Sequence, residues 1–213
     1  MNKTSNYHHG NLRLALLDAA DQVLQENGLQ GFTLRACARV AGVSHAAPKH
    51  HFGDVKGLLT AVAERGFERL VESLQAEISS AAGDLDQEMI ATARAYTGFA
   101  ERYPEHFRIM FRTDLTLIDP SNPPNAVLST FTELTNIILR QRGEPELEMN
   151  EMASERSAAV INDIVLGWSH IHGFAHLTLE GGIDFRRDQF SRSQEVVDGR
   201  SSGGHIHYLC VVL

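Results

Sequence analysis

This chain lacks the features that stabilise small secreted or membrane-bound proteins. Its two cysteines, Cys37 and Cys210, lie far apart in the sequence, which argues against a disulfide framework and favours a reducing compartment. No apolar run is long enough to cross a bilayer, and the polar, histidine-bearing start lacks the apolar core of a signal peptide. We therefore expect a cytoplasmic protein with no membrane segment.

Signals for β-strands and for catalysis are also scarce. Strand-like sequence is nearly absent before residues 206–213, and there are no repeats. Glycine-rich phosphate loops and the Gly-x-Ser-x-Gly motif are missing, so we expect neither an enzyme nor a cofactor. Apolar periodicity, caps and breakers instead predict an all-α fold. The expected helices span about residues 11–27, 33–41, 44–51, 55–80, 85–102, 104–112, 125–142 and 148–180.

Charge is distributed unevenly along the chain, whose formal net charge is -8. Residues 1–66 contain 7 of the 19 Lys and Arg residues but only 5 of the 27 Asp and Glu residues. The acidity therefore belongs to the later part of the chain. The slight positive excess of the first part supports nucleic-acid binding only weakly, and the case for it depends on a motif.

That motif lies between residues 33 and 59. Thr33 is placed to cap a helix, Gly42 can make a tight turn, and Ser44 can cap a second short helix. The first helix has an apolar face made by Leu34, Cys37, Ala38 and Ala41. This spacing is typical of a helix-turn-helix, whose second helix enters the major groove of DNA. A plain helical corner inside an all-α core is the alternative.

Lys56 favours the DNA-binding interpretation. It falls in the first turn of the next predicted helix, where a cation opposes the helix dipole. An external phosphate would explain a lysine at that position.

The motif residues resemble a known family. Leu17-x-Ala19-Ala20, Thr33-Leu34-Arg35, Ala41-Gly42-Val43-Ser44, His51-Phe52 and Lys56-x-Leu58-Leu59 are similar to the DNA-binding module of the TetR family of bacterial transcriptional regulators. The resemblance covers about residues 8–70. A looser one, over about 85–182, includes Trp168, His172 and Gly173 and resembles the branch whose C-terminal domain is named for a Trp-His-Gly motif.

The resemblance implies three parts: a three-helix helix-turn-helix domain over 8–55, a helical-bundle ligand-binding and dimerisation domain over 56–190, and an irregular tail over 193–213. It implies a ligand-responsive dimeric repressor that binds double-stranded operator DNA and a small-molecule effector, and that pairs through its last two long helices. The residues expected at the DNA are Thr33, Arg35, Ser44, His45, Ala46, Lys49, His51 and Lys56. Those expected to line the ligand pocket are Phe99, Tyr103, Phe107, Met110, Phe111, Trp168 and His172.

Two residues depart from the family pattern. Tyrosine is usual in the family at the position of Lys49. Pro48 lacks the amide hydrogen that would otherwise bond to the Ser44 carbonyl in a helix starting at Ser44. They motivate an alternative function: a helical, dimeric small-molecule or protein-binding protein with a degenerate DNA-binding module.

Three histidines, His170, His172 and His176, suggest a further alternative, a metal-sensing regulator. His172 and His176 are spaced for one helix face, as in some zinc sites, but no HExxH-type partner motif accompanies them. We therefore expect no metal site. We also expect Cys37 to be a packing residue rather than a redox sensor.

Overall fold

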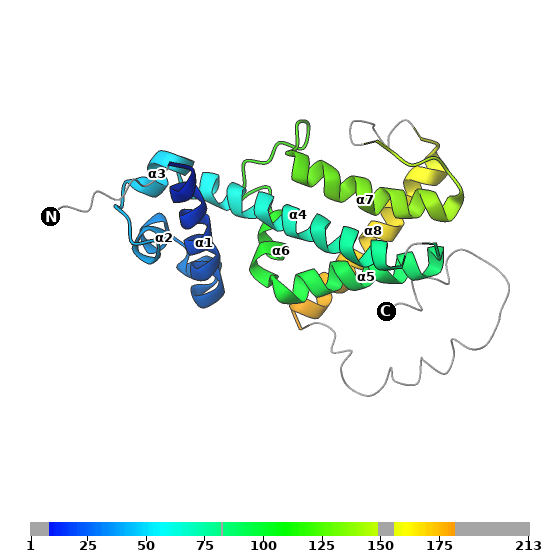
Figure 1. Ribbon diagram of the computed structural model, residues 1–213, viewed down its shortest axis with the longest axis horizontal. Helices are drawn as coiled ribbons and strands as arrows, with labels where there is room; N and C mark the ends of the chain where they lie inside the picture. Colours follow the sequence, from blue (N-terminus) through cyan, green and yellow to red (C-terminus); the bar gives the residue numbers. More distant parts are fainter. Residues whose placement is uncertain (1–8, 82, 149–155, 182–213) are drawn as a thin grey trace. The chain divides into compact units, whose positions relative to one another are not determined.

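The computed structural model of this protein describes residues 9–81, 83–148 and 156–181, and these ranges contain helices, turns and loops but no β-strand. The predicted all-α fold is confirmed (Figure 1). The strand-like residues 206–213 and the predicted tail lie outside the described ranges. The helices are α1 (His9–Asn27), the 3₁₀ helix η1 (Leu29–Gly31), α2 (Leu34–Val40), α3 (Ala47–Phe52), α4 (Val55–Ser80), α5 (Leu85–Arg102), α6 (Pro104–Met110), α7 (Asn125–Arg142) and α8 (Ala158–Leu179).

The chain divides into two compact units. The N-terminal unit comprises Met1–Glu68 and Glu105–Ala126, and the C-terminal unit comprises Arg69–Pro104 and Val127–Leu213. Helix α4 therefore contributes its first half to one unit and its second half to the other. The predicted domain ranges stay predictions, because a grouping by contacts does not test which parts fold or function independently. No helix in the described part of the chain is long and apolar enough to cross a membrane.

The core of the N-terminal unit forms where α1 packs against α2, and α2 against α3 (Figure 1). Apolar residues at helical spacing supply it, as the sequence pattern predicts. Cys37 is 0% exposed within this core, and burial raises the pKa of its thiol to about 11. A thiol that stays protonated and buried is a packing residue. The largest fully buried side chains of this unit are Phe107, Leu16, Leu24, Leu58 and Ile109.

The core of the C-terminal unit is built around the contact between α5 and α8. Tyr96 and Phe99 of α5 are buried there, and α7 adds Ile137 and Leu139. Val160 of α8 packs with Leu139 and Leu147 in an apolar cluster.

The last described helix begins later than predicted. A start at residue 148 is wrong, because Glu148 is not helical and α8 begins at Ala158, where the Val160 amide donates to Ser157 Oγ. A pair of buried hydrogen bonds holds Leu147, just before the predicted start, in a non-helical segment. Its amide donates to Asn136 Oδ1 at 2.8 Å, and Asn136 Nδ2 donates to the Leu147 carbonyl at 3.1 Å.

Candidate functional site

The corner between α2 and α3 has the geometry of a helix-turn-helix. The Ala36 amide donates to Thr33 Oγ1 at 3.0 Å, so Thr33 caps α2 as predicted. Gly42 has a φ of 66°, in the left-handed region that favours glycine. The Val43 amide then donates to the Ala38 carbonyl at 3.0 Å, which closes the end of α2.

The second helix of the motif starts three residues later than expected. Ser44 does not cap it: the Ser44 carbonyl accepts from the Ala47 amide at 3.0 Å in a turn, and α3 begins at Ala47. Pro48 is therefore in the first turn of α3, where amides have no intrahelical partner. The predicted loss of a hydrogen bond to Ser44 is wrong for this reason, and Pro48 is buried as a packing residue.

Residues that were predicted to contact DNA lie on the surface of this motif. Seven of the eight are exposed: Thr33, Arg35, Ser44, His45, Ala46, Lys49 and Lys56. The eighth, His51, is half-buried and its ring lies 5.3 Å from that of His50 and 6.3 Å from that of Phe52.

The position of Lys56 is set by the start of α4. Asp54 Oδ1 accepts from the Gly57 amide at 2.9 Å and so caps the helix. A Cβ atom at Gly57 would lie only 1.9 Å from the Phe52 carbonyl oxygen, so α4 begins in direct contact with the end of α3. Lys56 is exposed in that first turn, beside the motif.

Two cationic side chains near the motif were not among the residues predicted to contact DNA. Arg13 of α1 lies over the Phe52 ring, with its Cζ atom 5.1 Å from the ring centroid. Arg39 is exposed one helical turn after Arg35 on α2. The i, i+4 spacing of the two arginines could have predicted Arg39, whereas Arg13 comes from another helix and needs the tertiary structure.

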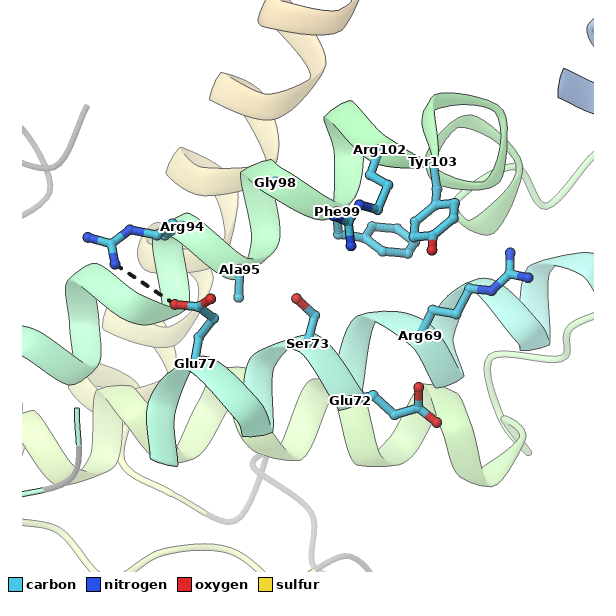
Figure 2. Close-up of a pocket in the computed structure, with 10 residues that line it drawn as sticks. All are labelled: Arg69, Glu72, Ser73, Glu77, Arg94, Ala95, Gly98, Phe99, Arg102 and Tyr103. Carbon is cyan, nitrogen blue, oxygen red and sulfur yellow. Dashed lines mark ion pairs between the residues drawn. The ribbon is translucent and has the colours of Figure 1, made fainter. Parts of the chain in front are cut away.

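A pocket of about 490 Å³ lies between α4 and α5 in the C-terminal unit. Figure 2 shows Arg94 paired with Glu77 at one end, at 3.9 Å, and Arg102 beside the rings of Phe99 and Tyr103 at the other. The ring centroids of Phe99 and Tyr103 are 5.4 Å apart. The pocket therefore combines charged and aromatic walls.

The residues predicted for the ligand pocket are not all brought together. Phe99 and Tyr103 line the pocket between α4 and α5, and both were predicted. Phe107, Met110 and Phe111 belong to the N-terminal unit, where the Phe111 ring lies 5.5 Å from Phe107 and 5.6 Å from Phe67. The rings of Phe67, Phe107 and Phe111 pack together there, and the predicted place of these residues in a ligand pocket stays a prediction.

Trp168 and His172 belong to a polar network inside the C-terminal unit. Trp168 Nε1 donates to the Tyr96 hydroxyl at 3.4 Å, and this hydroxyl lies 2.9 Å from His172 Nδ1. Burial lowers the pKa of His172, and the neighbouring His176 lowers it further. His172 is therefore held neutral at neutral pH and can share a proton with the tyrosine hydroxyl.

The histidines of α8 do not form a metal site in the described part of the chain. The rings of His172 and His176 are stacked, 6.3 Å apart, while His170 Nδ1 lies 2.7 Å from the Leu166 carbonyl. Within residues 9–81, 83–148 and 156–181, no three His, Cys, Asp or Glu side chains are grouped so that they could hold a metal ion. The metal-sensing alternative gains no support from this geometry.

Comparison with known proteins agrees with the motif. Residues 16–62 match the family model described as bacterial regulatory proteins, tetR family, and residues 89–198 match a model described as tetracyclin repressor-like, C-terminal domain. The chain belongs to the TetR family of bacterial transcriptional regulators. These are regulators and not enzymes. The matched C-terminal model is not the one named for a Trp-His-Gly motif, so the predicted branch stays a prediction.

Individual relatives cover the TetR-family chain to different extents. This chain is 33% identical over 102 residues to the HTH-type transcriptional regulator BetI of Rhizobium meliloti. The alignment spans 48% of this chain and 43% of BetI. The chain thus matches less than half the length of that relative. A solved protein of unknown function from Rhodococcus sp. RHA1 is 28% identical, with a TM-score of 0.64 over 98% of this chain and 93% of its own.

A more distant structure agrees in fold alone. The TetR family regulator PfmR of Thermus thermophilus is 17% identical, with a TM-score of 0.51 over 76% of this chain and 84% of its own.

Proposed function

We propose that this TetR-family chain is a dimeric, ligand-responsive repressor that binds operator DNA in the cytoplasm. The observation that carries the proposal is the capped helix-turn-helix, whose exposed residues can serve two kinds of contact. Thr33 and Lys56 can donate to phosphates, which set the register on DNA. Arg35, His45 and Lys49 carry donors that can reach base edges.

The later start of α3 bears on this assignment. Ser44, His45 and Ala46 precede the helix in a turn, so their backbone and side chains can approach a phosphate from the end of α3. Lys49 is exposed within the helix and replaces the usual family tyrosine with a cation. A long cationic side chain at that position is suited to a phosphate or to a guanine edge.

Helix α8 supports the proposed dimer. Three of its large apolar side chains are exposed on the isolated chain: Val165 at 53%, Leu166 at 54% and Leu177 at 46%. Apolar surface of this kind on a long helix is typical of a protein interface. Changing Val165 and Leu166 together to Glu should convert the dimer to a monomer in analytical ultracentrifugation, while the helical circular dichroism spectrum stays unchanged.

The DNA-binding proposal is tested by a gel-shift with the DNA upstream of the gene for this protein, followed by selection from random sequences. We expect a specific complex that Lys49→Ala and Arg35→Ala weaken. Arg142→Gln is the matched control, because Arg142 is an exposed arginine of the C-terminal unit, where it pairs with Asp163. Absence of a specific complex with both DNA sources would favour the alternative, a helical dimer that binds a small molecule or a protein and carries a degenerate DNA-binding module.

A further inference from the structure

The pocket between α4 and α5 carries more positive than negative side chains. Arg69, Arg94 and Arg102 line it, against Glu72 and Glu77. This excess stands out because the chain as a whole has a formal charge of -8. A positively charged hollow in an acidic protein attracts anions.

The three arginines are engaged to different degrees. Arg94 is paired with Glu77, and Arg69 lies over the Tyr103 ring with its Cζ atom 4.9 Å from the centroid. Arg102 is exposed, and it makes no ion pair with any residue of the described chain. Its planar guanidinium can therefore bind a carboxylate through two parallel hydrogen bonds.

The wall beside Arg102 is aromatic. The Phe99 side chain is buried and Tyr103 is half-buried, and the two rings are tilted by 45° (Figure 2). Rings at such an angle offer both a face and an edge to a planar or apolar group. Of the two acidic side chains, Glu77 is on the Arg94 end of the pocket, away from these rings (Figure 2).

Small residues of α5 open the space between the two ends. Ala95 and Gly98 line the pocket, and a Cβ atom built at Gly98 meets no atom within 4 Å. Ser73 of α4 projects its hydroxyl into the same space (Figure 2) and can add one hydrogen bond.

We propose that the effector of this regulator is an organic carboxylate with a planar or apolar body, whose carboxylate pairs with Arg102 and whose body packs on Phe99 and Tyr103. The assignment of this ligand as the effector rests on the proposed ligand-responsive function. A cation would meet three arginines against two glutamates, and a neutral ligand would not pair with Arg102, so the positive excess of the walls favours an anion.

The first test is direct binding to the full chain without DNA. Isothermal titration calorimetry with 2-naphthoate and decanoate should give saturable binding, and 2-naphthamide should bind at least about tenfold more weakly because it lacks the charge. Equal affinity for the acid and its amide, or no saturable binding of either carboxylate, would overturn the proposal.

Two variants locate the ligand. Arg102→Gln keeps a polar side chain but removes its charge, and should weaken carboxylate binding by about tenfold or more while leaving the weak binding of the amide unchanged. Gly98→Leu fills open space next to the same wall and should block both ligands without lowering the unfolding midpoint. Unchanged 2-naphthoate affinity in both variants would overturn the site. Arg142→Gln, which removes an arginine outside the pocket, is the matched control.

The effector role has a separate readout. Addition of the carboxylate should reduce the gel-shift of the unmodified chain and leave that of Arg102→Gln unaltered. A carboxylate that binds but leaves a working gel-shift unchanged would overturn the effector role. Loss of the gel-shift without any ligand would instead count against the proposed DNA binding, and the calorimetric result would still decide the ligand class.

Discussion

His106 Nε2 lies 2.9 Å from Asp21 Oδ1, so that a buried ring of α6 is joined to α1. Asp21 Oδ2 also accepts from Arg65 Nη1 of α4 at 3.0 Å. The network therefore links three helices of the N-terminal unit.

Removal of the His106 ring should destabilise the N-terminal unit. His106→Ala leaves a hole beside Asp21 and removes one of its polar partners, which we expect to cost about 1–3 kcal/mol in the free energy of unfolding. Urea unfolding followed by circular dichroism measures this cost. The exposed pair Arg112–Asp114 is the comparison, because its disruption by Asp114→Asn should cost less than the loss of the His106 ring. Equal costs for the two variants would contradict a structural role of the network.

Substitution of Gly57 by alanine should destabilise the folded chain, whereas the same substitution at Gly98 should not. A Cβ atom at Gly57 would meet the Phe52 carbonyl at 1.9 Å, and a backbone oxygen cannot move aside without displacing α3. Gly57→Ala should therefore cost about 1–3 kcal/mol in the free energy of unfolding, as overpacking does elsewhere. Gly98→Ala meets open space in the last turns of α5 and should stabilise the chain by roughly 0.5–1 kcal/mol. Urea titrations of both variants check the contrast, and similar midpoints would refute it.

Lys56 should contribute to DNA affinity without contributing to sequence preference. If its ammonium group contacts a phosphate, Lys56→Ala weakens binding to operator and to unrelated DNA alike, and reduces the slope of log affinity against log salt by about 1. Gel-shifts at several salt concentrations measure the slope. An unchanged slope would remove Lys56 from the interface, whereas a loss confined to the operator would make it a base contact.

His172 should make the C-terminal unit less stable in mild acid. Because burial lowers its pKa in the folded chain, the unfolded chain takes up the proton first as pH falls. The stability is thus fully present above the ordinary histidine pKa of about 6.5 and declines as pH drops from there toward the lowered value. Unfolding in urea at about pH 7.5 and about pH 5.5, on either side of that ordinary pKa, should show a smaller decline for His172→Gln than for the unmodified chain. Parallel declines in the two proteins would argue against His172 as the cause.

The features that the sequence predicted correctly are those set by a residue and its near neighbours in the chain. Thr33 caps α2 and Gly42 turns the chain with a positive φ because each outcome depends on the residue itself and its immediate neighbours. The apolar spacing in α1 and α4 likewise predicted helices and their buried faces, since an amphipathic pattern repeats every few residues. The family followed from such local signals in order along the chain.

Predictions failed where distant residues decide the outcome. Leu147, beside the predicted start of the last helix, is held in a non-helical segment by Asn136, 11 positions away, and no local pattern reports that pair. The late start of α3 has a local cause instead, a turn in which the Ser44 carbonyl accepts from the Ala47 amide before the helix begins.

The sequence by itself therefore determined the helical class, the helix-turn-helix and the family, because these rest on periodicity, caps and turns that act over a few residues. Only the tertiary structure decided which side chains share a pocket. Arg69 of α4 and Arg102 of α5 are 33 positions apart, and they line one hollow because the two helices pack with those faces together. Periodicity predicts that a helix has a buried face, but the partner of that face is selected by packing and charge across the whole unit.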